Sequence, residues 1–225
     1  MIKENLNRIK ATLPAGVTLV AVSKTHPAEM LQEAYDAGQR IFGENKVQEM
    51  TAKSQVLPTD IQWHFIGHVQ SNKIKMMAPY VSVIQGVDTF DKLAEIDRQA
   101  ARFNRHITCL LQLHIATEET KFGFSADECT AMLDEGKWNE LKNITLGGVL
   151  GMASNTEDEA PVRGEFRRLK KLFDTYKEKY FSDSPDFKTI SAGMSGDYEL
   201  AIEEGSNMVR IGSSIFGERN YNINK

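Results

Sequence analysis

Apolar runs alternate with amphipathic stretches along the whole chain. The runs have the spacing of strands, and the stretches between them repeat apolar residues every three or four positions, as helices do. We expect strands over 17–23, 40–44, 61–67, 81–88, 106–115, 143–152, 187–194 and 208–218. We expect helices over 27–38, 45–57, 70–80, 89–103, 125–136, 158–180 and 196–205, and a short amphipathic one within 1–16. Thr89 and Ser125 are suitable N-caps, and Pro161 and Gly164 predict an irregular start to the helix over 158–180.

The order of these segments predicts an α/β fold. Eight strand-then-helix units require a parallel sheet, because parallel strands need crossover connections. Eight units in 225 residues fit a compact single-domain (β/α)8 TIM barrel over residues 1–225. An open doubly wound sheet is the alternative. Its dinucleotide-binding version is disfavoured, because no Gly-x-Gly-x-x-Gly motif follows the first strand.

Composition and charge exclude several classes of partner. The formal net charge is −4 and the sequence pI is about 5.8, which argues against nucleic acid or an anionic membrane as the main partner. No apolar run approaches the roughly 20 residues that cross a bilayer, and the charged N-terminus is unlike a secretory signal. Cys109 and Cys129 have no metal-ligand spacing. We therefore expect free thiols and a cytoplasmic protein.

The first candidate for chemistry is Lys24, at the end of the apolar run TLVAVS (18–23). In a barrel, active sites lie at the carboxyl ends of the strands. A lysine that emerges from dry surroundings is shifted toward its neutral form and becomes a nucleophile toward aldehydes. The alternative is a solvated lysine at the barrel rim.

Two loops near the C-terminus predict a phosphate site. SAGMSGD (191–197) forms the turn between the seventh strand and its helix, and RIGSS (210–214) is the end of the eighth strand and the turn beyond it. Barrels often bind phosphate in these two loops, through backbone N–H groups at a helix N-terminus. Ser195, Ser213 and Ser214 add hydroxyl donors, although Gly and Ser also simply build turns. A reactive lysine opposite a phosphate cradle describes a site for pyridoxal phosphate. Arg210, two residues before Gly212, could reach the pyridine nitrogen and weaken the ring as an electron sink; a rim salt bridge is the alternative.

Six motifs resemble the YggS/PROSC family of pyridoxal phosphate homeostasis proteins. They are LVAVSKTHP (19–27), FGENKVQEM (42–50), WHFIGHVQSNK (63–73), KFGF (121–124), GMSGDYELAIEEGS (193–206) and MVRIGSSIFGER (208–219). The resemblance is collinear over about residues 17–219. It implies a fold-type III barrel, similar to the N-terminal domain of alanine racemase.

The resemblance also assigns roles to individual residues. It implies that Lys24 forms the Schiff base with the cofactor, that Asn45 lies near the ring, and that His64 lies beside the site. The remaining matches, around ring and phosphate, are Met194, Ser195, Arg210, Gly212 and Ser213. The chain departs from the family pattern at Ala192, at Ser213 and in strand 143–152, and none of these changes removes a group that binding requires.

The resemblance implies that the chain holds and buffers or delivers the cofactor rather than turning over substrates. A racemase needs a second acid or base opposite Lys24, and neither Tyr198 nor Tyr221 is a clear candidate. We also expect the chain to lack the extra domain that supplies this group in alanine racemase. The alternatives are a weak pyridoxal phosphate-dependent amino-acid racemase, or a phosphate-binding barrel without this cofactor.

The expected partners follow from the same interpretation. They are pyridoxal phosphate and, as recipients, apo-enzymes that use it, with no nucleic acid and no membrane. His26, His64, His68, His106 and His114 show no metal-ligand pattern, since HFIGH (64–68) lies on a strand. The basic run 167–180 is expected to form a solvated outer helix. With no second domain to complete a neighbour's site, we expect a monomer.

Overall fold

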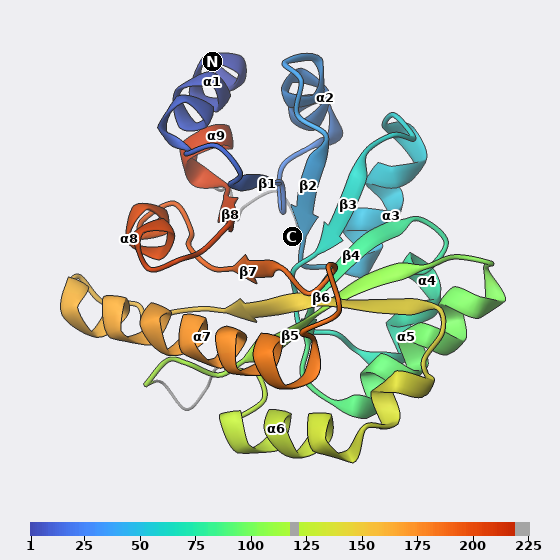
Figure 1. The fold of residues 1–225 in the computed structure, drawn as a ribbon. Coiled ribbons are helices and arrows are strands. Elements are labelled where there is room, and N and C mark those ends of the chain that lie inside the picture. Colours follow the sequence, from blue (N-terminus) through green and yellow to red (C-terminus); the bar gives the residue numbers. More distant parts are fainter. Residues whose placement is uncertain (118–121, 219–225) are drawn as a thin grey trace.

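A closed barrel of eight parallel strands forms the centre of the protein (Figure 1). The computed structural model describes residues 1–117 and 122–218. The strands follow one another around the barrel in sequence order, and β8 pairs with β1 to close it. They are β1 (Thr18–Val22), β2 (Ile41–Glu44), β3 (Gln62–Phe65), β4 (Val81–Val87), β5 (Ile107–Leu113), β6 (Ile144–Gly151), β7 (Thr189–Ser191) and β8 (Met208–Ile211). The predicted barrel is confirmed, and an open sheet is excluded.

The helices form a ring outside the strands (Figure 1). They are α1 (Ile2–Thr12), α2 (Ala28–Asp36), α3 (Val47–Val56), α4 (Ile74–Met77), α5 (Phe90–Arg102), α6 (Ala126–Glu135), α7 (Glu159–Tyr180), α8 (Tyr198–Glu203) and α9 (Ser213–Phe216), with 3-10 turns η1 (Ser71–Lys73) and η2 (Lys137–Glu140). The N-terminal helix α1 lies beside α9, where the Asn5 side-chain amide donates to the Ile215 carbonyl at 3.1 Å. The two ends of the described chain therefore pack together.

The main core lies between the strands and the helices. Its fully buried side chains include Phe42 and Ile84 from strands, and Leu31, Met50 and Ile96 from helices. This arrangement follows from the alternating pattern, since strands and amphipathic helices each present an apolar face. The predicted caps are confirmed: the Thr89 side chain accepts from the Lys92 amide, and Ser125 forms a capping box with Glu128.

Several predicted boundaries are wrong, and one predicted irregularity is absent. The last strand ends at Ile211 rather than 218, because Gly212 adopts non-extended dihedral angles and α9 begins at Ser213. The helix expected over 70–80 is only η1 and α4, which ends two residues before Pro79. By contrast, α7 runs through Pro161 without a break. Pro161 is its third residue, where a backbone N–H has no acceptor within the helix.

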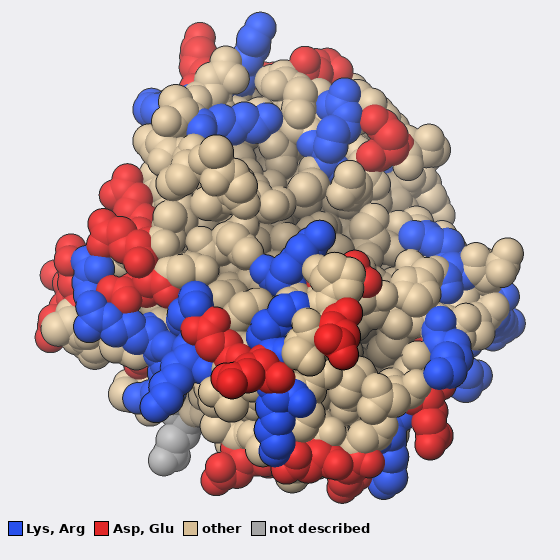
Figure 2. All heavy atoms as spheres, viewed as in Figure 1, with Lys and Arg blue, Asp and Glu red and all other residues tan. Residues whose placement is uncertain are grey.

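Several basic residues of α7 lie on the outside of the barrel and are paired with acids. Figure 2 shows positive and negative side chains interleaved over this region. Arg163 bonds Glu203 and Glu204, and Arg167 bonds Glu204 at 2.7 Å. The run is thus a solvated outer face, as predicted. No helix in residues 1–117 or 122–218 combines the length and apolar character of a membrane span.

Candidate functional site

Lys24 lies in the turn directly after β1 and is half-buried. The next residue, Thr25, has a φ of 68°. This left-handed conformation is uncommon outside glycine and is unfavourable for a β-branched side chain. Contacts elsewhere must therefore hold the turn that carries Lys24.

Strand pairing places the other predicted residues beside this turn. Val22 of β1 is opposite Gly43 of β2, so the segments with Lys24 and Asn45, two residues further on in each case, leave neighbouring strands at the same end of the barrel. On the other side β1 pairs with β8, and a Cβ at Gly212 would lie 3.0 Å from the Val22 carbonyl oxygen. Lys24 and the loop after β8 are thus neighbours at one end of the barrel.

The loops after β7 and β8 contact each other. The Gly212 amide donates to Ser195 Oγ at 3.4 Å, and the Arg210 amide donates to the Gly193 carbonyl at 2.9 Å. The loop after β7 is itself closed by Asp197, whose carboxylate accepts from the Met194 amide at 2.6 Å. The result is a group of backbone and hydroxyl donors from both loops, with Ser213 exposed at its edge.

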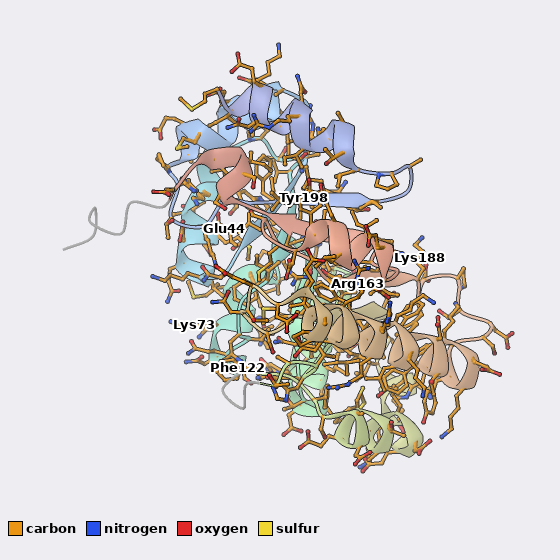
Figure 3. All side chains as sticks on the ribbon, turned by 90° about the vertical axis from the view of Figure 1, so that its left-hand side faces the viewer. Glu44, Lys73, Phe122, Arg163, Lys188 and Tyr198 are labelled. Atoms are coloured by element: carbon orange, nitrogen blue, oxygen red, sulfur yellow. The ribbon has the colours of Figure 1, made fainter. Side chains whose placement is uncertain are left out.

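Figure 3 shows the end of the barrel to which these residues belong. Lys188, just before β7, marks the amino ends of the strands, and Glu44, the last residue of β2, lies toward the opposite side together with Lys73 and Phe122. Lys24, Asn45 and the loops after β7 and β8 all follow their strands. They therefore share the carboxyl end, where barrels place their chemistry.

Arg210 lies inside the barrel and anchors a chain of hydrogen bonds across it. Its guanidinium donates to Ser191 Oγ at 2.7 Å and to the Gly151 carbonyl at 3.2 Å. Ser191 Oγ donates to Gln85 Oε1 at 2.6 Å, and Gln85 Nε2 lies 2.8 Å from His64 Nδ1. Burial lowers the pKa of Arg210 to about 10, which Asp197 partly opposes, so this group is a cation at neutral pH.

The donor-only guanidinium sets the direction of every bond in this chain. Because Arg210 can only donate, Ser191 Oγ accepts from it and its hydroxyl donates a hydrogen bond to Gln85 Oε1. The Gln85 amide nitrogen in turn donates to His64. His64 Nδ1 is then an acceptor and Nε2 carries the hydrogen. Burial lowers the pKa of His64 to about 3, so the ring is neutral at physiological pH.

A buried ion cluster lies directly behind the Lys24 turn. The Lys53 ammonium of α3 bonds Glu44 Oε1 and Glu49 Oε1, each at 2.7 Å, and the Ser23 carbonyl at 2.9 Å. Ser23 Oγ also donates to Glu44 Oε1 at 2.6 Å. Glu44 Oε2 is buried with no hydrogen-bond partner among the described residues. Burial raises the pKa of Glu44 to about 7, although the Lys53 charge pulls it down.

The sequence interpretation did not identify Gln85, Ser191, Glu44, Glu49 or Lys53. A usable signal was present for Gln85, Ser191 and Glu44, which are polar residues at buried positions of otherwise apolar strands. Nothing in the local sequence distinguishes Lys53 from the solvated lysines of other helices. Of the two tyrosines that were considered and not assigned to the site, Tyr198 lies against α1, with its hydroxyl 3.0 Å from Thr12 Oγ1. Tyr221 lies outside the described residues.

Comparisons with known proteins agree with the resemblance seen in the motifs. The family model described as the N-terminal domain of alanine racemase matches residues 1–220. The pyridoxal phosphate homeostasis protein of Aquifex aeolicus (strain VF5) is 36% identical, over 90% of this chain and 87% of that protein. The protein of the same name from Vibrio alginolyticus is 37% identical, over 92% of this chain and 89% of that protein.

Solved structures give the same answer. PipY from Synechococcus elongatus PCC7942 is 32% identical and covers 96% of this chain, with a TM-score of 0.90 without PLP and 0.87 with PLP bound; each match spans 100% of the PipY chain. An alanine racemase of Clostridium difficile 630 has a TM-score of 0.79 at 14% identity, which shows a common fold. The chain therefore belongs to the YggS/PROSC family of pyridoxal phosphate homeostasis proteins.

Proposed function

We propose that this protein binds pyridoxal 5'-phosphate as a Schiff base on Lys24 and serves its homeostasis, by buffering or delivering it to apo-enzymes. The observation that carries the proposal is the shared location of Lys24 and the two contacting loops after β7 and β8 at the carboxyl end of the barrel. A relative with the same fold, PipY, has been solved with PLP bound.

The residues present fit an aldehyde that carries a phosphate. Lys24 would supply the amine that holds the cofactor's aldehyde as a Schiff base. Ser195, Ser213 and the backbone amides around Gly212 supply neutral donors for an anion. Asn45 Oδ1 is buried with no hydrogen-bond partner among the described residues, as expected of a group that faces a ligand.

The charges of the site favour holding the cofactor over using it. Bound pyridoxal phosphate acts as an electron sink when its ring nitrogen is protonated. The buried Arg210 guanidinium would disfavour this protonation if the ring nitrogen binds beside it. His64, with a pKa of about 3, is poorly matched to proton transfer near pH 7, because general acid–base catalysis works best with a pKa near the operating pH.

A covalent trapping experiment tests the proposal. Purified protein is incubated with pyridoxal phosphate and reduced with borohydride, and its intact mass and peptide map are measured. The expected result is one reduced adduct on Lys24, together with loss of the visible Schiff-base absorption. Lys24→Ala should form no specific adduct, whereas Lys73→Ala, which removes another lysine at the same end of the barrel, should behave like the wild type. An adduct that persists in Lys24→Ala at wild-type yield would refute the assignment.

A second measurement separates a carrier from a weak racemase. Holo-protein is incubated with a panel of L-amino acids in deuterated water, and incorporation of deuterium at the α-carbon is followed by NMR. We expect no exchange above that of free pyridoxal phosphate. Exchange at ordinary enzyme rates, on the order of 1 s⁻¹ or faster, would favour the racemase.

A further inference from the structure

The Lys24 turn is held from one side by two charged residues of α3. The Lys53 ammonium donates to the carbonyl of Ser23, the residue before Lys24, at 2.9 Å. The Glu49 carboxylate accepts from the amide of Thr25, the residue after Lys24, at 2.6 Å. Lys53 and Glu49 are themselves bonded at 2.7 Å, one turn apart on the helix. The backbone on each side of Lys24 is therefore tied to the same ion pair.

This arrangement explains how an unfavourable backbone conformation persists. Thr25 has a φ of 68° and is exposed, so packing of its own side chain cannot hold the turn. Strained residues of this kind persist only when their surroundings over-determine them, and they concentrate at functional sites. Two hydrogen bonds to charged groups supply that constraint, since such bonds are stronger than neutral ones.

Burial makes the Lys53 side of this arrangement rigid. Lys53 is 6% exposed and Glu44 is fully buried, so water competes little for these bonds. Lys53 can reach Ser23, Glu44 and Glu49 at once only from one position, because all three acceptors bond the same nitrogen. A long flexible side chain is thereby reduced to a fixed donor.

We propose that Lys53, acting with Glu49, is a positioning residue that fixes the Ser23–Thr25 turn and so preorganises Lys24 for the cofactor aldehyde. The inference rests on the proposed function, because it assumes that Lys24 is the attachment point. Glu44 has a different part: it neutralises and orients Lys53 from behind. Tyr80 is another ionisable group near Glu44, and its hydroxyl lies 2.9 Å from Oγ1 of Thr51 in α3.

Four variants separate positioning from simple stability. Lys53→Met alone leaves the carboxylates of Glu44 and Glu49 without their positive partner, and Glu44 is buried. This variant is therefore expected to destabilise the fold. The double variant Lys53→Met/Glu44→Gln removes the buried negative charge as well, so its thermal unfolding should return toward that of the wild type. Glu44→Gln alone keeps the Lys53 bonds to Ser23 and Glu49 and is the matched control. Lys170→Met, at a partly exposed lysine paired with Asp174 on α7, controls for the loss of a positive charge.

The measured quantities are the apparent Kd for pyridoxal phosphate and the rate of borohydride-trapped adduct formation on Lys24. In the folded double variant we expect the Kd to rise about tenfold or more and trapping to slow, the effect of losing a hydrogen bond to a charged group. Lys170→Met should match the wild type, and Glu44→Gln, which keeps the Lys53 bonds to Ser23 and Glu49, should raise the Kd less than the double variant does. Wild-type Kd and trapping in the double variant would overturn the inference while leaving Lys24 as the attachment point. Failure of the wild type to trap on Lys24 refutes the proposed function itself.

A measurement on the unmodified protein covers the case in which the variants do not fold. Hydrogen exchange of the Thr25 amide is followed by NMR in the cofactor-free wild type. A preorganised turn predicts slow exchange of this amide before any cofactor binds, because Glu49 holds it, although the residue is exposed. Exchange at the rate of an unprotected amide without cofactor would overturn the inference.

Discussion

Glu44 should make the free energy of unfolding depend on pH, because it is a fully buried carboxyl whose second oxygen has no partner among the described residues. Burial raises its pKa from 4.5 to about 7, even though Lys53 and Ser23 both bond its other oxygen. The perturbation is Glu44→Gln. The amide keeps an acceptor oxygen for Lys53 and Ser23 but has no proton to lose.

The size and sign of the effect follow from this pKa. A tenfold change in proton affinity corresponds to ~1.36 kcal/mol, so ionising Glu44 costs the folded state ~3 kcal/mol relative to the unfolded chain. Below about pH 4.5 the carboxyl is protonated in both states and the cost is absent. Between pH 4.5 and about 7 the unfolded chain loses the proton first, so stability falls as pH rises. Above about pH 7 the cost is complete and constant.

The assay is urea unfolding of the cofactor-free protein, followed by circular dichroism at several pH values from about 4.5 to 8. The free energy of unfolding of Glu44→Gln minus that of the wild type should increase by ~3 kcal/mol across this range, because all other titrating groups are shared. Glu178→Gln, on the exposed side of α7, removes the same formal charge from solvent and serves as the control. A difference that stays constant with pH, or that grows toward acid, would refute the reasoning.

Three further predictions concern other parts of the structure. Arg210→Met loses two hydrogen bonds but also removes a buried cation whose pKa is lowered by burial; we expect the apo-protein's unfolding free energy to change by no more than ~1–2 kcal/mol, while pyridoxal phosphate binding measured by titration weakens at least about tenfold. A loss of stability with unchanged affinity would contradict this. Gly67→Ala places a Cβ 2.4 Å from the Asn45 carbonyl oxygen and should destabilise the fold by ~1–3 kcal/mol; Gly196→Ala, with nothing within 4 Å, is its control, and equal melting temperatures for the two variants would argue against the clash. Ser125→Ala removes the α6 cap and should lower the unfolding free energy by ~1 kcal/mol, with no effect on cofactor binding, as chemical denaturation and titration can check.

The order of elements was predictable because the signals that determine it are local. Strand and helix periodicity, the Thr89 and Ser125 caps and the alternation of units all act within a few residues of one another. The strand ends were less predictable. Ile211 ends β8 because of the dihedral angles of Gly212, and a glycine in a small-residue run is equally compatible with a longer strand.

The eightfold βα order, the position of Lys24 at a strand end and the loops at 191–197 and 210–214 can all be read from local patterns in the sequence. The surroundings of these residues depend on how the whole chain folds. Arg210, Ser191, Gln85 and His64 come from four strands and meet only because the barrel closes. Lys53 becomes a buried donor only because α3 packs behind the turn after β1. These contacts join residues far apart in sequence, so no local pattern encodes them. Burial in the packed protein then strengthens the hydrogen bonds of Arg210 and Lys53, because water competes little for them.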